Sequence, residues 1–240
     1  MPADSMVPHG KALLSYFEGD QSADLIVRRD DGLESTLPVR HFFRSPAEFT
    51  RLENAALERC NGTILDVGAG AGLHSLALQE RGFDVTAIDI DHNAVKIMKY
   101  RGVLNAQCVD IFEYAGRPVD TVLLLGHGIG MVETLAGLDR FLPFMQTRMA
   151  PRGRILLDSL DVRTTSDPRH LAYQANNRLA GRYIGETRLQ FEYRGVEGPT
   201  CGWLHIDAET LAEIADRSGW SCRVIEQLES GEYLAQLSLR

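Results

Sequence analysis

The segment that decides the fold reads Ile64-Leu65-Asp66-Val67-Gly68-Ala69-Gly70-Ala71-Gly72. An apolar run that ends in glycines predicts a buried strand followed by a tight turn, because glycine reaches positive φ at little cost. A helix expected over residues 73–81 would present free backbone N–H groups to a ligand at this turn. The glycine spacing fits neither the dinucleotide pattern GxGxxG nor a phosphate-binding loop ending in Gly-Lys-Ser/Thr, so NAD and ATP are poor candidates for that ligand.

Strands and helices alternate along the chain after this segment. The pattern predicts helices at 92–101 and 133–149 and strands at 84–89, 106–110, 120–125 and 154–158. This alternation is typical of a parallel sheet with helices on both faces. Strands are also expected at 221–227 and 233–239, where turns indicate an antiparallel portion. The predicted fold class is therefore α/β, a doubly wound, mostly parallel sheet with an antiparallel C-terminal portion.

The segments outside this core are more polar. Ser45 and Glu48 form the capping pattern of a helix expected from residue 46 to about residue 59. Residues 161–177 give no clear pattern. The remaining expected elements are a helix at 11–17, a strand at 24–28 that enters a hairpin turn at 29–32, strands at 186–194 and 202–206, and a helix at 207–218.

The composition limits the classes of protein to which this chain can belong. Of the 240 residues, 44% are hydrophobic, which is enough to bury a large core. Acidic residues outnumber basic ones by 33 to 25, and the net charge of −8 disfavours a broad nucleic-acid or anionic-membrane surface. No apolar run reaches the roughly 18 residues of a membrane span, and no secretory signal pattern is present. The four cysteines lack metal-binding spacing, so we expect no metal and predict reduced thiols in a cytoplasmic protein.

Three aspartates lie where strands end. Asp66 lies two positions before the first glycine, Asp89 ends the second strand, and Asp110 follows the third. In a doubly wound sheet, an acid at the end of the second strand accepts hydrogen bonds from ribose hydroxyls. Asp110 is placed to meet an adenine amino group, with the apolar Ile111 against the ring. The alternative for Asp89 is an ordinary aspartate at the end of a strand.

Four motifs, which occur one after another along the sequence, resemble those of the class I S-adenosylmethionine-dependent methyltransferases. They are ILDVGAGAG (64–72), VTAID (85–89), CVDIF (108–112) and APRGRILLDS (150–159). The resemblance covers about residues 46–160 and implies a Rossmann-like fold. It also implies S-adenosyl-L-methionine as the cofactor and S-adenosyl-L-homocysteine as the product.

The resemblance assigns the cofactor contacts residue by residue. Gly68 and Gly70, with Ala69 between them, would bound the methionine part of the cofactor. Asp89 would hold the ribose next to Ile90. Asp110 and Ile111 would face the adenine. Asp66 is expected under the loop, where it either supports the loop or reaches the methionine amino group through water.

A second glycine-rich loop, Gly126-His127-Gly128-Ile129-Gly130, follows the fourth strand. His127 is the candidate general base or acceptor-orienting group, because the reference pKa of histidine lies near neutrality. The alternative is that His127 only contacts the cofactor, as expected of Gly126, or caps a helix. Upstream, the resemblance suggests that Arg44 pairs with the methionine carboxylate, although a solvated arginine is the alternative. Tyr16, together with Phe43, is a candidate to cover the sulfonium through a cation–π contact, and the alternative is that these aromatic residues belong to the core.

The acceptor pocket is expected outside the core. Tyrosine and asparagine side chains can fix a small polar ligand, so the candidate acceptor residues are Tyr16, Tyr173, Asn177, Tyr193 and Trp203. The alternative for each of them is a structural role. We expect one domain of 240 residues, divided into an N-terminal lid segment (1–45), a cofactor-binding core (46–160), an acceptor-specificity insert (161–205) and a C-terminal completion of the sheet (206–240).

The sequence therefore predicts a methyltransferase that acts on a small-molecule acceptor by in-line displacement. The expected partners include no nucleic acid and no membrane, and the expected assembly is a monomer or a homodimer. One rival is an enzyme that uses S-adenosylmethionine for elimination or cyclisation, which would release methylthioadenosine. Another is a binding module without turnover. Methylation of RNA or protein is a third possibility, and the acidic charge disfavours RNA.

Overall fold

The computed structural model describes all 240 residues and contains two sheets. The larger sheet has the strand order β11-β12-β7-β6-β3-β4-β5. Its strands are β3 (Thr63–Val67), β4 (Asp84–Asp89), β5 (Ala106–Cys108), β6 (Val119–Leu124), β7 (Met149–Leu160), β11 (Trp220–Gln227) and β12 (Glu232–Leu239). The strands from β3 to β7 pair in parallel, and β12 runs antiparallel to both β7 and β11. The predicted fold class is confirmed, including the antiparallel C-terminal portion.

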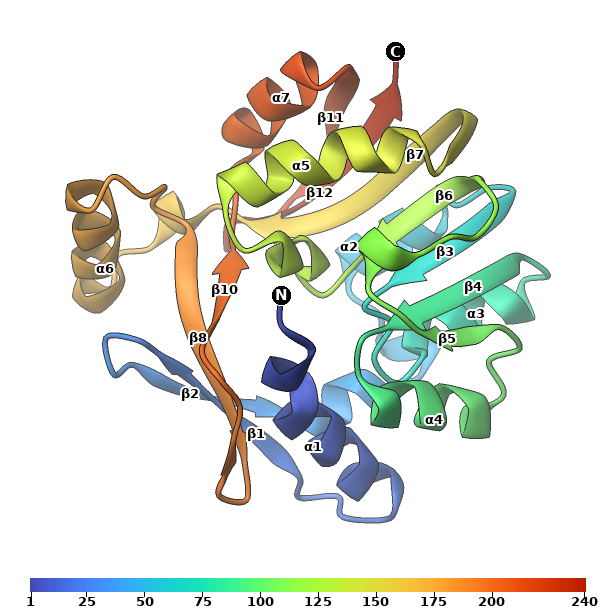
Figure 1. The fold of residues 1–240 in the computed structure, drawn as a ribbon, viewed down its shortest axis with the longest axis horizontal. Coiled ribbons are helices and arrows are strands. Elements are labelled where there is room, and N and C mark those ends of the chain that lie inside the picture. The colour runs from blue at the N-terminus through green and yellow to red at the C-terminus, as the bar shows by residue number, and fades with distance from the viewer.

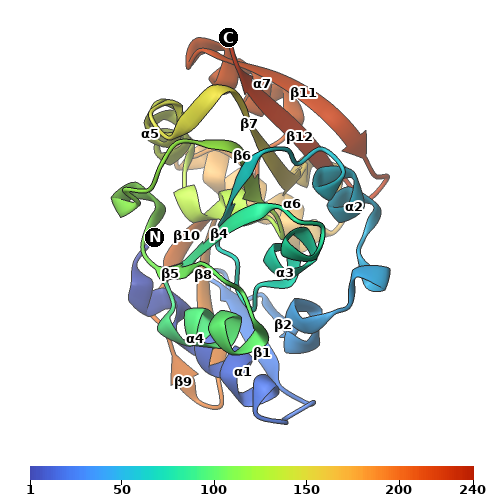
Figure 2. The same ribbon diagram turned by 90° about the vertical axis from the view of Figure 1, so that its right-hand side faces the viewer.

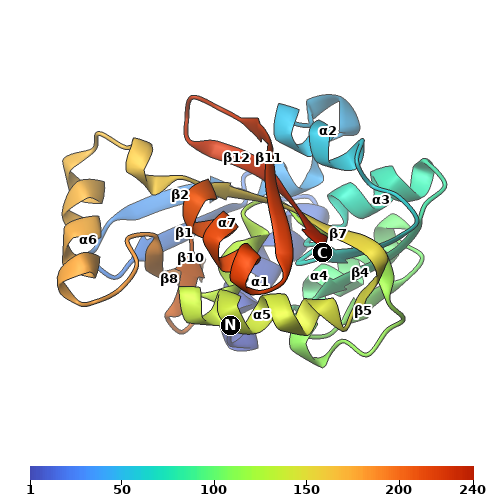
Figure 3. The same ribbon diagram turned by 90° about the horizontal axis from the view of Figure 1, so that it is seen from above.

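Helices cover both faces of the larger sheet (Figure 3). Helices α5 (Leu135–Gln146) and α7 (Ala208–Arg217) pack on one face, in an apolar cluster that contains Trp220 and Tyr233. Helices α2 (Arg51–Leu57) and α3 (Leu73–Glu80) pack on the other face, against side chains such as Ile64 and Leu123. Helix α4 (His92–Arg101) lies against β4 and β5. Burial on both faces explains the continuous apolar runs in the strand sequences.

The second sheet is antiparallel and joins two distant parts of the chain. It has the order β10-β8-β1-β2, with β9 paired to β8. Its strands are β1 (Asp24–Arg29), β2 (Glu34–Pro38), β8 (Glu186–Tyr193), β9 (Val196–Glu197) and β10 (Cys201–Leu204). Figure 1 shows this sheet opposite the carboxyl ends of β3, β4 and β6, with α1 (Val7–Phe17) between it and α4. Figure 2 shows the same contact of α1 with α4 from the side.

The helix expected from residue 46 to residue 59 is interrupted. A 3₁₀ turn, η3 (Pro46–Glu48), is followed by extended backbone at Phe49, and α2 begins at Arg51. Two capping boxes in succession explain the break. Ser45 and Glu48 form the expected one, and Thr50 and Glu53 form a second that starts a new helix three residues later.

Two other helices also differ from expectation. α5 begins at Leu135 because the hydroxyl of Thr134 accepts the N–H of Gly137 as an N-cap, and residues 128–132 form the 3₁₀ turn η5 (Gly128–Val132). The sequence pattern missed α6 (Pro168–Leu179), which Asp167 caps. Most of α6 is polar and exposed, so its apolar periodicity is too weak to be recognised.

The topology places both glycine-rich loops at one edge of the larger sheet. The chain passes from β3 to β4 and β5 on one side, and then returns to β6 on the other side of β3. Ligands bind at such a switch point, outside the carboxyl ends of the strands. No helix is both long enough and apolar enough to cross a lipid bilayer.

The buried hydroxyl of Tyr233 tests the packing of the C-terminal strands. It donates a hydrogen bond to the carbonyl of Ile206 at 2.7 Å, in the segment before α7. Replacing Tyr233 with phenylalanine should lower the free energy of unfolding by about 1–3 kcal/mol, because a buried carbonyl loses its donor. Urea denaturation measures this change. The control Tyr100→Phe, at a side chain that is 68% exposed, should change stability by less than about 0.5 kcal/mol. Equal effects of the two substitutions would contradict this role for Tyr233.

Candidate active site

The glycine loop after β3 passes over the end of β4. The N–H groups of Gly68 and Ala69 both donate to the carbonyl of Ile88, at 2.9 and 3.1 Å. Gly68 has a φ of +69°, and a Cβ added there would have no neighbour within 4 Å. At Gly72 a Cβ would lie 2.8 Å from Cγ2 of Val103, so that glycine is required for packing. Open space therefore lies beside Gly68, where a ligand can contact the backbone directly.

Asp89 connects this loop to the next one. Its Oδ2 accepts the N–H of Gly70 at 2.9 Å, and its Oδ1 accepts the N–H of Asp91 at 2.9 Å. The side chain is buried, and burial raises its pKa to about 6, against the lowering effect of the two N–H donors. Ile90 lies half-buried between Asp89 and Asp91. This carboxylate at the end of the second parallel strand has the position expected of a ribose-binding acid.

The other two aspartates have different surroundings. Asp66 is buried beneath the loop and accepts a hydrogen bond from the Ser75 hydroxyl at 2.6 Å, while burial raises its pKa. It therefore connects the end of β3 to α3 across the loop. Asp110 caps a short turn by accepting the N–H of Phe112 at 2.8 Å. Ile111 is buried in the same apolar cluster as Val67 and Ile129.

The N-terminal segment covers the glycine loop. The ring of His9 on α1 meets Phe42 of the 3₁₀ turn η2 (Val39–Phe43) edge to face, with ring centroids 4.8 Å apart. Phe42 lies 3.6 Å from the position that a Cβ on Gly70 would take. His9 is buried, and burial lowers its pKa to about 4. Sequence reasoning missed both residues, because neither belongs to a recognisable motif.

Tyr16 and Arg44 have partners within the protein. The Tyr16 ring stacks on Phe43 at 4.7 Å. The guanidinium of Arg44 donates to both carboxylate oxygens of Glu53, at 2.8 and 3.2 Å, and His74 of α3 bonds to the same carboxylate at 2.8 Å. Burial acts to raise the pKa of Glu53, but these bonds, together with the N–H of Thr50, lower it to about 2. Arg44 thus lies near the start of α3, and its contact with a cofactor stays a prediction.

His127 is the centre of a cluster of polar groups at the other loop. Its Nε2 lies 3.5 Å from Oε1 of Glu232 and 3.8 Å from Oδ2 of Asp158. Its ring also meets His205 edge to face, with centroids 5.5 Å apart. These groups come from the loop after β6, from β7 and β12, and from the segment after β10, so only the folded chain brings them together. Sequence reasoning found His127 and missed its three neighbours.

The backbone at His127 is strained. Gly126 and His127 both have positive φ, +68° and +59°, a conformation that is uncommon for a residue other than glycine. The N–H of His127 donates to Oδ1 of Asp158 at 3.1 Å, which holds the loop in this conformation. Strain of this kind costs of order 1–3 kcal/mol and persists only where other contacts enforce it. Asp158 therefore fixes both the backbone and the electrostatic surroundings of His127.

The expected acceptor residues do not gather in one place. Tyr173 lines a cavity under α6, but its hydroxyl donates to Asp30 at 2.7 Å and accepts the N–H of Arg188. Asn177 is buried and donates to the carbonyls of Ile184 and Glu186. Tyr193 donates to Asp20 at 3.3 Å, and Trp203 packs so closely on η5 that a Cβ on Gly130 would overlap its ring. No group of three or more His, Cys, Asp or Glu side chains is placed to hold a metal ion.

The surroundings of His127 predict its titration. Burial acts to lower the pKa of His127, but the carboxylates of Glu232 and Asp158 outweigh it and raise the pKa above the usual 6.5. In Glu232→Gln, the midpoint of an NMR titration of His127 should therefore fall. The contacts of protonated His127 with Glu232 and Asp158 contribute to the free energy of unfolding. This contribution is fully present below the pKa of free histidine and is lost as the pH rises through the higher pKa of His127 in the folded state. The exposed Glu229→Gln is the control, and an unchanged midpoint in Glu232→Gln would contradict the assignment.

Comparisons with known proteins agree on the family. A family model described as a methyltransferase domain matches residues 39–224. A SAM-dependent methyltransferase from Bacteroides fragilis, solved in complex with S-adenosyl-L-homocysteine, is 34% identical, and the match covers 100% of this chain and 97% of that one, with a TM-score of 0.86.

A more distant solved structure shows the fold alone. The glycopeptide N-methyltransferase MtfA, also solved with S-adenosyl-L-homocysteine, has 13% identity and a TM-score of 0.54, over 80% of this chain and 91% of that one. The ribosomal RNA small subunit methyltransferase A of Corynebacterium jeikeium is 28% identical over 136 residues, 47% of this chain. The match spans 43% of that curated relative's length. The family model and the full-length match to the Bacteroides structure show that this chain belongs to the class I S-adenosylmethionine-dependent methyltransferases.

Proposed function

We propose that this protein transfers a methyl group from S-adenosylmethionine to a small-molecule acceptor. The observation that carries the proposal is the pairing of an open glycine loop with the buried carboxylate of Asp89 at the carboxyl edge of the sheet. The relative from Bacteroides fragilis was solved with S-adenosyl-L-homocysteine, which is the product of such a transfer. Four free cysteines support the predicted reducing, cytoplasmic environment.

The residues present fit this cofactor. The backbone of Gly68, Ala69 and Gly70 would contact its methionine part, because no Cβ of Gly68 fills the space there. Asp89 would accept hydrogen bonds from the ribose hydroxyls. When bound, the cofactor supplies an electrophilic methyl group on a positively charged sulfur.

Further contacts would complete the cofactor site. Ile90, Asp110 and Ile111 follow the neighbouring strands β4 and β5 and are assigned to the ribose and the adenine. Gly126 follows β6 at the same edge of the sheet. Arg44 stays a candidate only if its guanidinium can serve a second carboxylate besides that of Glu53.

The residues of this chain would orient the acceptor and stabilise the charge that forms during the reaction. Orienting the acceptor in line with the methyl group is worth up to about 7–11 kcal/mol in well-ordered systems. His127 would take a proton from the acceptor when the acceptor must lose one. The carboxylates of Asp158 and Glu232 would then stabilise the imidazolium, in the same way that they raise the pKa of His127.

A small acceptor agrees with the charge of the molecule. The second sheet lies opposite the strand ends (Figure 1). The net charge of −8 disfavours RNA, although the curated relative from Corynebacterium acts on ribosomal RNA, as its name states. We therefore prefer a metabolite as the acceptor.

The cofactor assignment predicts the effect of Asp89→Ala. This variant should bind S-adenosyl-L-homocysteine roughly 10- to 100-fold more weakly, because hydrogen bonds to a charged group are lost. Since burial raises the pKa of Asp89 to about 6, the wild-type affinity should also fall as the pH drops through 6. Isothermal titration calorimetry measures both effects. Asp84→Ala, at the exposed start of the same strand, is the matched control, and equal affinity of both variants would overturn the assignment.

If His127 is the general base, its replacement should affect turnover much more than cofactor binding. With an acceptor found by mass spectrometry in a metabolite extract, His127→Ala should lower kcat by about 10²- to 10⁴-fold and leave cofactor affinity nearly unchanged. Equal losses in both would make His127 a binding residue. The product distinguishes the rival chemistries, since methylthioadenosine in place of S-adenosyl-L-homocysteine would indicate elimination or cyclisation. No turnover with any extract would favour a binding module.

A further inference from the structure

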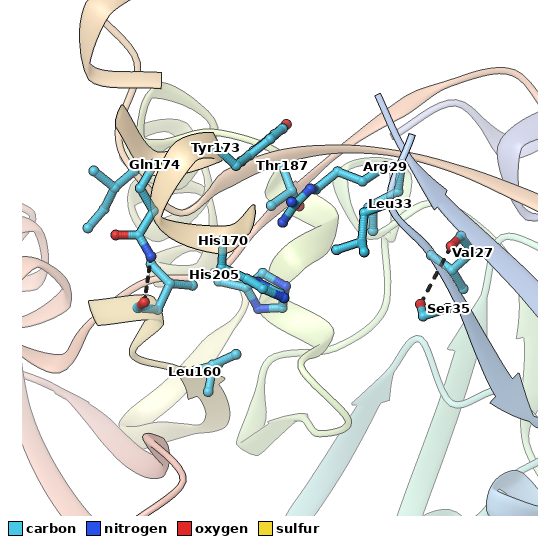
Figure 4. Close-up of a pocket in the computed structure, with 13 residues that line it drawn as sticks. Val27, Arg29, Leu33, Ser35, Leu160, His170, Tyr173, Gln174, Thr187 and His205 are labelled. Carbon is cyan, nitrogen blue, oxygen red and sulfur yellow. Dashed lines mark hydrogen bonds between the residues drawn. The ribbon is translucent and has the colours of Figure 1, made fainter. Parts of the chain in front are cut away.

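A cavity of about 260 Å³ lies between the second sheet, α6 and the end of β7 (Figure 4). Seven of its 13 lining residues are hydrophobic, among them Val27 and Leu189 of the sheet and Leu33 of the turn between β1 and β2. Figure 4 shows Tyr173 and Gln174 of α6 on one side, Arg29 and Leu33 on the other, and His205 near the centre of the view. The volume is close to the lower end of the range for small-molecule pockets, so the cavity suits a small ligand.

Most polar groups around the cavity already have partners in the protein. The guanidinium of Arg29 donates twice to the carboxylate of Asp31, at 2.9 and 2.8 Å. The hydroxyl of Thr187 donates to the carbonyl of Trp203 at 2.8 Å, and the side-chain amide of Gln174 donates to the carbonyl of Val162 at 2.6 Å. No aspartate or glutamate lines the cavity, and its one arginine is neutralised by Asp31. The cavity therefore favours an uncharged ligand.

The two histidines that line the cavity are the exceptions among these groups, because His170 makes no side-chain hydrogen bond within the protein and neither does His205. The Nδ1 of His205 is buried without a hydrogen-bond partner, which is unusual for a buried polar atom and points to a missing ligand or water. The adjacent Ile206 fixes the segment, because its N–H donates to the hydroxyl of Ser159 at 3.1 Å. Burial, assisted by the charge of His127, lowers the pKa of His205 to about 3. The ring is thus neutral at physiological pH, with one N–H donor and one acceptor nitrogen.

His205 also connects the cavity to the candidate active site. Its ring meets the ring of His127 at 5.5 Å, and His127 belongs to the loop at the carboxyl end of β6. A ligand that reaches His205 from the cavity therefore lies beside the loop at which methyl transfer is proposed. A hydroxyl group matches the imidazole best, because it can donate to one nitrogen or accept from the other. A carboxylate can only accept, and an ammonium group can only donate.

We propose that this cavity binds the methyl acceptor, and that the acceptor is a small, uncharged, largely apolar molecule whose hydroxyl group hydrogen-bonds to the imidazole of His205. The proposal rests on the proposed function and names its substrate class. His205 acts in it as the specificity-determining residue, and His127 keeps its separate role at the reacting end.

Phenol is the probe for this cavity, and fluorobenzene, benzoate and benzylamine are the comparisons. Each is titrated into the full chain saturated with S-adenosyl-L-homocysteine, with ¹³C- and ¹⁵N-labelled histidine observed by NMR. Phenol should bind more tightly than the other three and shift the ring signals of His205 but not those of His41, which is exposed. In His205→Phe, phenol binding should weaken roughly two- to tenfold, as expected for one hydrogen bond, while fluorobenzene binding is retained. His41→Phe is the matched control and should bind phenol like the wild type.

Several results would overturn the proposal. They are phenol binding that leaves His205 unperturbed, unchanged phenol affinity in His205→Phe, or tighter binding of benzoate or benzylamine. If His205→Phe does not fold, the wild-type titration and a His205→Gln variant, which keeps a donor and an acceptor, decide the question. Failure to bind S-adenosyl-L-homocysteine would instead contradict the proposed function. Normal binding of that compound without a phenol response contradicts this inference alone.

Discussion

The carboxylate of Asp89 is the constraint on which the rest of the site depends. One oxygen holds the glycine loop through the N–H of Gly70, and the other holds the start of the next segment through the N–H of Asp91. Asp91 in turn caps α4 by accepting the N–H groups of Asn93 and Ala94. A single buried charge therefore sets the relative positions of two loops at the sheet edge. The two backbone N–H donors offset part of the free-energy cost of burying this charge. The part that they do not offset raises the pKa of Asp89.

A second set of constraints acts at the loop after β6. Asp158 accepts the N–H of His127 and so maintains its positive φ, while Glu232 approaches the ring from β12. The antiparallel insertion of β12 beside β7 brings Glu232 to this edge, opposite Leu160 in the strand pairing. Because β12 runs antiparallel to β7, its first residue lies at this edge of the sheet. Glu232 therefore adds a second carboxylate beside His127, next to that of Asp158 on β7.

The sequence predicts the centre of this molecule well and its periphery poorly. The glycine run, Asp89 and the alternating strands carry local signals, and the structure has them where the pattern indicates. α6 has no such signal, because its buried side chains, Tyr173, Gln174 and Asn177, are polar or partly polar. The sheet that joins residues 24–38 to residues 186–204 depends on long-range pairing, which no single segment encodes. For the same reason His205 and Glu232, far from His127 in sequence, could not be assigned to its neighbourhood.

The central claim is that the edge formed by Gly68, Gly70 and Asp89 binds S-adenosylmethionine. The most direct test is a calorimetric titration of the full chain with S-adenosyl-L-methionine and S-adenosyl-L-homocysteine, with NAD as the comparison. We expect saturable one-site binding of the first two compounds and no heat of binding with NAD. Binding of NAD, or the absence of binding by both sulfur compounds, would contradict it.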